Sequence, residues 1–282
     1  MTEKNFIDVE NVIRSKSENL YKLLPGFIIR YLKRIVHEDE INAAIARNKD
    51  VYGVEFAKHI LEEFRVKIVI EGEEHILSSN RFLAVSNHPL GGLDGIALLH
   101  RIGQYKPIKA VINDLLMNVK NLSPLFIPVN KHGNNPKSYI KILNDAFDSE
   151  DNILYFPAGL VSRKEGKIIK DLEWKKSFLQ KAVKSKRDII PVYVSGRNTN
   201  FFYNLANLRK KLGIKANIEM LYLVDEMYRQ KDAVIKIIYG KPIPYSVFDN
   251  SKDDSTWASL LREHCYRLAL DKDAVFLNNP SI

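Results

Sequence analysis

Residues 82–95 read Phe-Leu-Ala-Val-Ser-Asn-His-Pro-Leu-Gly-Gly-Leu-Asp-Gly, and this stretch decides the fold. Its opening part, Phe82–Ser86, is a short apolar run of the kind that forms a buried strand. A His-Pro step and a Gly-Gly pair follow, and Asp94 lies at the start of an apolar helical pattern over Leu93–Ile102. A strand that passes through a tight turn into a helix is the building unit of an α/β sheet.

Similar apolar runs recur along the chain and alternate with helical patterns. Besides Phe82–Ser86, we expect strands at Val66–Ile70, Ile108–Ile112, Leu125–Val129, Asn152–Phe156, Ile189–Val194, Ile218–Val224 and Ala233–Tyr239. Besides Leu93–Ile102, we expect helices at Lys137–Phe147, Glu173–Val183, Phe201–Leu212 and Thr256–Ala269. We therefore predict an α/β fold whose largely parallel central sheet is covered by helices on both faces.

The region before the first expected strand is helical in pattern. One face of period 3.6 is formed by Val51, Val54, Ala57, Ile60, Leu61 and Phe64. No linker rich in Pro, Gly or Ser divides the chain. We predict one domain, with an N-terminal helical extension over residues 1–64 and an α/β region over residues 65–282.

Composition narrows the class of protein. The chain has 282 residues, 45% of them hydrophobic and 27% charged, which excludes wholesale disorder. A single cysteine, Cys265, excludes a disulfide framework, and the histidines outside residues 82–95 show no ligand spacing, so we expect no metal. The formal net charge of +9 suits an anionic partner such as phospholipid, nucleic acid or a phosphorylated substrate, although many soluble enzymes are equally basic.

His88 and Asp94 are the first candidates for chemistry. The strand ends beside His88, and open α/β sheets place their sites at this end of the strands. Asp94 can fold back onto the imidazole, fix its tautomer and leave the other nitrogen as a general base. Gly91 and Gly92 can direct N–H groups toward a developing oxyanion. The alternative is a buried histidine beside an aspartate that only caps the helix.

The segment Asn87-His88-Pro89-Leu90-Gly91-Gly92-Leu93-Asp94-Gly95 resembles the catalytic block of the glycerolipid, or lysophosphatidic acid-type, acyltransferase superfamily. That family commonly has four residues between His and Asp, whereas five intervene here. The longer spacing resembles a subgroup with NHPxGGxDG-like sequences. This subgroup includes O-acyltransferases that complete ornithine or glycine lipids.

Three further segments resemble family blocks in the same order. Residues 123–129, Ser-Pro-Leu-Phe-Ile-Pro-Val, match at Phe and Ile but lack the family's Gly and Arg, and Lys131 is the nearest cation. Residues 156–163, Phe-Pro-Ala-Gly-Leu-Val-Ser-Arg, match Phe-Pro-Glu-Gly-Thr-Arg except that Ala158 replaces the Glu and Arg163 comes two places late. Residues 190–192, Ile-Pro-Val, match the fourth block. The resemblance implies a substrate site formed by Asn87, Gly91, Gly92, Lys131, Phe156, Pro157, Gly159 and Arg163. Arg163 is equally interpretable as a solvated surface cation, and for Lys131 the surface interpretation is favoured.

The resemblance implies transfer of a fatty acyl group from a thioester of acyl carrier protein or coenzyme A to the hydroxyl of a lyso-lipid. His88 would be the general base and Asp94 its orienting partner, with no bound cofactor.

The motifs of serine hydrolases, P-loop proteins and dinucleotide-binding proteins do not occur. A non-catalytic basic protein that binds membrane or nucleic acid is the alternative, but the cations are not interleaved with aromatic residues on a recognisable nucleic-acid-binding module. The residues do not distinguish between acceptor lipids, acyl chain lengths, the two kinds of thioester donor or oligomeric states.

An amphipathic pattern near the N-terminus indicates contact with a membrane. Apolar Phe27, Ile28, Tyr31 and Leu32 share a predicted helix with basic Arg30, Lys33 and Arg34. The alternative is a helix packed on the core, and residues 201–215 are a weaker second candidate for membrane contact. The polar N-terminus resembles no signal peptide, and no apolar run approaches the ~20 residues of a membrane span. We expect a cytoplasmic protein bound peripherally to the inner face of the cell membrane, with anionic lipids as partners.

Overall fold

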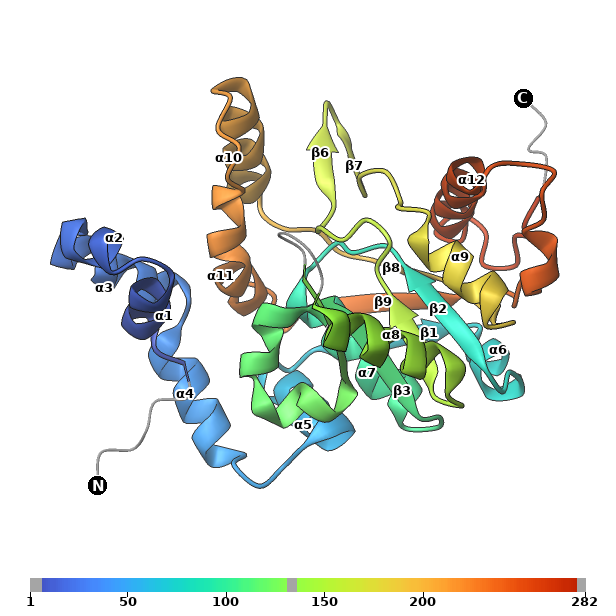
Figure 1. The fold of residues 1–282 in the computed structure, drawn as a ribbon, viewed down its shortest axis with the longest axis horizontal. Coiled ribbons are helices and arrows are strands. Elements are labelled where there is room, and N and C mark those ends of the chain that lie inside the picture. Colours follow the sequence, from blue (N-terminus) through green and yellow to red (C-terminus); the bar gives the residue numbers. More distant parts are fainter. Residues whose placement is uncertain (1–6, 131–135, 278–282) are drawn as a thin grey trace.

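The computed structural model describes residues 7–130 and 136–277. Its main sheet has the strand order β1 (Lys67–Glu71), β9 (Val234–Tyr239), β8 (Asp188–Val194), β2 (Phe82–Ser86), β5 (Asn152–Tyr155), β3 (Ile108–Asn113) and β4 (Phe126–Val129) (Figure 1). Neighbouring strands in this sheet are parallel except for the antiparallel pair β8–β9. The predicted α/β fold with a largely parallel sheet is confirmed.

The central strand β2 shows why the strands could be recognised as continuous apolar runs. Phe82 and Ala84 point into one hydrophobic cluster, whereas Leu83 and Val85 point into another on the opposite face. Both faces are covered because helices pack on each of them. The first face carries α5 (Gly53–Glu63), α6 (Glu73–Ser78) and α7 (Gly92–Gly103), and the second carries α8 (Lys137–Asp148), α9 (Ser177–Lys184) and α12 (Asp254–Arg267).

The N-terminal region is helical, as the sequence predicts. It contains α1 (Val9–Lys16), α2 (Glu18–Leu23), α3 (Gly26–Ile35) and α4 (Glu38–Arg47), followed by α5. Figure 1 shows α1–α4 grouped at one end of the molecule and α9 and α12 at the other. Helix α5 belongs to the main core, because Phe56 and Leu61 are buried in the same cluster as α7. Within the described part of the chain, no helix combines the length and apolar character needed to cross a bilayer.

The expected strand at Ile218–Val224 is wrong. This segment forms the 3₁₀ helix η3 (Ile218–Tyr222) and the start of α11 (Leu223–Tyr228), which follow α10 (Asn200–Lys211). Glu219 of η3 and Glu226 of α11 are both buried. The hairpin of β6 (Arg163–Glu165) and β7 (Ile168–Lys170) was not predicted. The other 3₁₀ helices of the described residues are η1 (Asp114–Asn118), η2 (Lys120–Leu125) and η4 (Tyr245–Val247).

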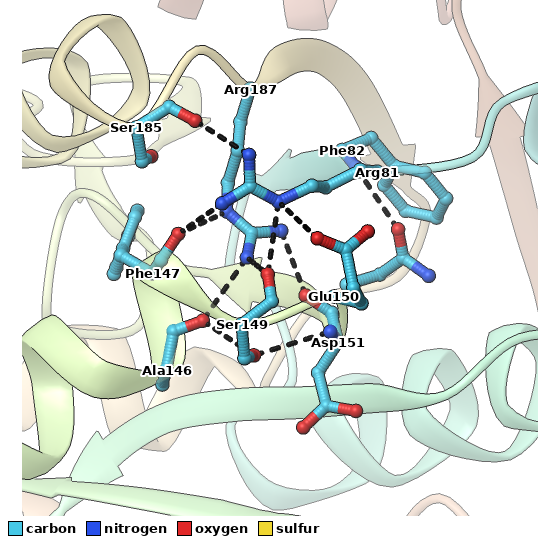
Figure 2. A network of polar contacts seen from close by, with 10 residues as sticks. Arg81, Phe82, Ala146, Phe147, Ser149, Glu150, Asp151, Ser185 and Arg187 are labelled. Atoms are coloured by element: carbon cyan, nitrogen blue, oxygen red, sulfur yellow. Dashed lines mark hydrogen bonds and ion pairs between the residues drawn. The ribbon is translucent and has the colours of Figure 1, made fainter.

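Two arginines stabilise the end of the sheet at which β2, β5 and β8 begin (Figure 2). The fully buried Arg187 donates hydrogen bonds to the carbonyls of Ala146 (3.1 Å), Phe147 (2.9 Å) and Asp151 (2.7 Å). Arg81 donates to the Phe147 carbonyl from the other side, at 2.9 Å. These carbonyls belong to the last turn of α8 and the loop after it, where a helix lacks intrahelical donors and favours positive charge. Burial lowers the pKa of Arg187 to about 10, so it remains charged at neutral pH.

We predict that Arg187→Leu lowers the free energy of unfolding by about 3–5 kcal/mol, because several buried carbonyls lose their charged donor. Urea unfolding followed by circular dichroism measures the change. Arg47→Leu is the matched control, since Arg47 is 57% exposed and pairs with Glu63 on the surface. The control should lose less than about 1 kcal/mol. A loss equally small for Arg187→Leu would contradict this role.

Candidate active site

The turn between β2 and α7 is built around Gly91. Its φ of +79° and ψ of −115° define a backbone conformation that other residues rarely adopt. A Cβ atom at this position would lie 3.3 Å from Val161 and 3.4 Å from Leu223. The backbone conformation therefore favours glycine and the neighbouring side chains leave little room for a Cβ atom, so the chain reverses tightly enough for α7 to start directly beside the end of β2.

This turn brings His88 and Asp94 together. The His88 Nδ1 atom lies 2.9 Å from Asp94 Oδ1, and the second carboxylate oxygen accepts a hydrogen bond from the Leu90 N–H at 2.8 Å. The Asp94 side chain is fully buried, whereas that of His88 is 19% exposed. The spacing of five residues thus places a buried carboxylate behind an imidazole that solvent and ligand can reach. Such a pair can orient a histidine and stabilise its protonated form.

The segment at residues 156–162 forms a second wall beside the imidazole. The Phe156 ring packs against His88 at 4.2 Å between centroids, tilted by 30°. Pro157 is buried, and Gly159, with φ of +63°, closes a turn by donating its N–H to the Phe156 carbonyl at 3.0 Å. The Ser162 N–H donates to the His88 carbonyl at 2.8 Å, so the two loops are joined at the catalytic candidate.

Asp171 is a site residue that the sequence analysis missed. Its carboxylate accepts hydrogen bonds from the His88 backbone N–H (3.2 Å), the Ser162 hydroxyl (2.6 Å) and the Trp174 indole N–H (2.9 Å). Only 5% of the residue is exposed, and burial raises its pKa. Asp171 follows a charged hairpin and lies 83 residues from His88 in sequence, so no local pattern marks it.

Asn87 is buried, and its side-chain amide is hydrogen-bonded to the main chain of Val194. Its side-chain amide donates to the Val194 carbonyl at 2.8 Å and its oxygen accepts the Val194 N–H at 2.7 Å. These bonds tie the ends of β2 and β8 together, so the amide is committed to the backbone and not directed at a substrate. Gly92, in contrast, is exposed at the first position of α7, beside the His88 turn. Lys131 lies outside the described residues.

Arg163 is neither a surface cation nor a side chain presented to a ligand. It is 3% exposed, and its guanidinium donates to Glu219 at 2.9 Å. Arg209 donates to the other oxygen of the same carboxylate at 2.7 Å. Burial lowers the pKa of Arg163, while Glu219 opposes the change. The expectation that Arg163 binds an anionic substrate group is therefore corrected: its charge is paired inside the protein and connects β6, α10 and η3.

The amphipathic helix α3 divides into exposed and packed parts. Phe27 and Tyr31 are 61% and 37% exposed, and Arg30 and Arg34 are exposed as well. Lys33 differs from the predicted basic face, because its ammonium lies 2.8 Å from Glu10 and 3.5 Å from Glu38. The remaining members of the predicted set, Ile28 and Leu32, are half-buried.

A cleft of about 400 Å³ lies between α3 and the segment formed by η3 and α11, and Phe201 of α10 also lines it. Tyr31 and Tyr222 share a hydrogen bond between their hydroxyls at 2.8 Å, and His37, just after α3, lies 3.1 Å from Asp225. On its other side, α11 places Leu223 near the Gly91 turn. The helix therefore contacts both the N-terminal helices and the candidate site.

The chain matches a protein-family model and two curated relatives that share one name, and it aligns weakly with one solved structure. A family model described as "Acyltransferase" matches residues 11–275. A lyso-glycine lipid O-acyltransferase from Bacteroides thetaiotaomicron is 45% identical over 264 residues, covering 93% of this chain and 97% of the relative. A protein of the same name from Phocaeicola vulgatus is 43% identical over 264 residues, covering 93% and 95%. The crystal structure of the 1-acyl-sn-glycerophosphate acyltransferase PlsC from Thermotoga maritima aligns with a TM-score of 0.46 and 16% identity, covering 86% of this chain and 92% of that one.

Proposed function

The chain belongs to the acyltransferase family, and from this premise we propose that it transfers a fatty acyl group from an acyl thioester to the hydroxyl of a lyso-glycine lipid or a closely related lyso-amino-acid lipid. The acceptor class is supported by two relatives at 43–45% identity that share this name and align over most of their length. The observation that carries the chemistry is the 2.9 Å contact between His88 Nδ1 and the buried Asp94 carboxylate. The alternative of a non-catalytic basic binding protein is set aside, because this is an enzyme family.

His88 acts in this proposal as the general base. With Nδ1 facing Asp94, Nε2 takes the proton from the acceptor hydroxyl as its oxygen attacks the thioester carbonyl. The carbon–sulfur bond then breaks, the ester forms, and the proton passes to the leaving thiolate. The tetrahedral oxyanion needs N–H donors, and Gly92 at the start of α7 offers one where a helix lacks intrahelical acceptors. No bound cofactor takes part, and the donor is a thioester of acyl carrier protein or coenzyme A.

The proposed enzyme works on a membrane. A lipid with two acyl chains leaves a bilayer with difficulty, at ~0.8 kcal/mol per CH₂, so the site must reach the interface. Support comes from α3, where the aromatic Phe27 and the cationic Arg30 and Arg34 are all exposed. We propose that these side chains dock the protein on the anionic inner face of the cell membrane.

The catalytic assignment predicts that His88→Ala and Asp94→Asn each lower kcat by about 10²–10⁴. Alanine removes the base, and asparagine cannot balance the charge of the imidazolium. Initial rates with a radiolabelled acyl thioester measure the effect. His59→Ala is the matched control, because that histidine lies in α5 and bonds Asn48. Normal turnover in a folded His88→Ala protein would refute the assignment.

The acceptor assignment predicts that purified enzyme acylates lyso-glycine lipid with a kcat/KM at least about tenfold above that for lysophosphatidic acid. A tenfold ratio corresponds to the free energy of about one strong polar contact to the preferred headgroup. Acyl carrier protein and coenzyme A thioesters are supplied in parallel, and the products are identified by mass spectrometry. Equal or faster acylation of lysophosphatidic acid would contradict the acceptor while leaving the enzyme class intact. Lipid profiles of a deletion strain should show the matching lyso-lipid accumulating.

Membrane docking predicts separate apolar and electrostatic contributions from the exposed side chains near α3. Leu23→Ser with Phe27→Ser should weaken vesicle binding at least about tenfold, because both side chains are exposed apolar groups. Arg30→Gln with Arg34→Gln should weaken it about 30-fold on anionic vesicles only, at roughly 1 kcal/mol for each cation. Flotation with phosphatidylglycerol-containing and purely phosphatidylcholine vesicles separates the two.

Ile168→Ser with Leu270→Ser is the matched control for docking. Both side chains are apolar and exposed, at 67% and 90%, but they lie in β7 and after α12. If the control pair loses as much vesicle binding as Leu23→Ser with Phe27→Ser, α3 is not the anchor. Melting curves by circular dichroism verify that each variant is folded.

A further inference from the structure

Asp171 is a buried carboxylate for which the proposed mechanism has no use. It lies directly after β7, between the hairpin and α9, and is 5% exposed. Burying a carboxylate is unfavourable unless hydrogen bonds or charges compensate it, and here burial raises the pKa of Asp171. One of the hydrogen bonds that compensate the buried Asp171 carboxylate comes from the main chain of His88, the proposed general base.

The donors to Asp171 come from both loops of the candidate site. Oδ1 accepts the His88 N–H at 3.2 Å and the Ser162 hydroxyl at 2.6 Å, while Oδ2 accepts the Trp174 indole N–H at 2.9 Å. The Ser162 N–H in turn donates to the His88 carbonyl at 2.8 Å. Both polar groups of the His88 main chain are therefore held, one by Asp171 itself and one by the residue whose hydroxyl Asp171 binds.

Helix α12 fixes Asp171 from behind. The Asp171 N–H donates to the Tyr266 hydroxyl at 2.8 Å, and Arg262 approaches the Asp171 carbonyl at 3.5 Å. These contacts hold the main chain and leave the carboxylate directed at His88, Ser162 and Trp174. Cys265 of the same helix is buried nearby, and its pKa is raised by burial, so it is uncharged at neutral pH.

We propose that Asp171 is a positioning residue for acyl transfer: it fixes the main chain of His88 so that the imidazole stays between Asp94 and Phe156, and its negative charge favours the protonated imidazole formed in the reaction. The proposal rests on the proposed function. Its physical basis is that a ring held by Asp94 alone could still shift with its own backbone. A displacement of about 1 Å at a reacting group can cost about 10²-fold in rate.

The decisive variant is Asp171→Asn combined with Trp174→Phe. In Asp171→Asn alone, the new amide N–H₂ would face the Trp174 N–H, and two opposed donors destabilise the fold. Trp174→Phe removes that indole donor, so the double variant tests the lost charge without the clash. Three quantities are measured for each protein: the melting temperature, kcat with KM for the lyso-lipid, and the acid limb of the pH dependence of kcat.

We expect the double variant to melt close to Trp174→Phe alone but to have a kcat about 10- to 100-fold lower, with KM within about twofold. Its acid limb should move to lower pH, because a protonated imidazole is less stable without the neighbouring carboxylate. Asp188→Asn is the matched control: Asp188 also accepts a backbone N–H, from Tyr245 at 3.1 Å, but it lies at the start of β8, away from His88. The control should change neither kcat nor the acid limb.

The proposal is overturned if kcat of the double variant equals that of Trp174→Phe, or if the acid limb does not move, because a purely structural role would affect only melting. Failure of the proposed function is a separate result. If the wild-type protein transfers no acyl group to any lyso-lipid, the function is wrong. If the wild type is active and the double variant matches its reference, only the positioning role is wrong.

Discussion

A fully buried carboxylate needs hydrogen-bond donors or a positive charge beside it, and the candidate site depends on how Asp94 obtains these partners. One oxygen lies 2.9 Å from His88 Nδ1 and the other accepts the Leu90 N–H at 2.8 Å. Both contacts depend on the reversal of the chain at Gly91, whose positive φ favours glycine. The turn at Gly91, the contact of the imidazole with Asp94 and the burial of that acid therefore form one arrangement around a compensated charge.

The sequence was sufficient where short-range patterns control structure. β2 was predicted at its observed bounds because its side chains alternate between two faces of the sheet and both faces are covered. Phe82–Ser86 therefore forms a continuous apolar run that ends in Ser86. The proximity of His88 and Asp94 followed from a turn of fixed length. The expected strand at Ile218–Val224 was wrong because a short apolar run does not by itself distinguish a strand from a helix. The buried acids Glu219 and Glu226 in and after this segment have their partners elsewhere in the chain.

Long-range contacts explain the other errors. Arg163 was interpreted from its neighbours Lys164, Glu165 and Lys167, which suggest a surface loop, but its partner Glu219 lies 56 residues away. Asp171 was overlooked for the same reason, since its value to the site comes from contacts with His88 and Trp174 and not from any motif. A buried ion pair or a second carboxylate leaves no local signature, because neither is set by the spacing of adjacent residues.

The helical conformation of residues 218–228 also connects the N-terminal helices with the candidate site. A strand there would have extended the sheet and left the N-terminal helices without a partner on this side. The helices η3 and α11 instead place Tyr222 against Tyr31 of α3, while Leu223, the next residue, lies near the Gly91 turn. Two consecutive short helices, η3 on the side of α3 and α11 on the side of the His88 turn, thus lie between the exposed residues of α3 and that turn. Because these helices pack against one another, the docking proposed for α3 would also set how the His88 site is oriented toward the membrane.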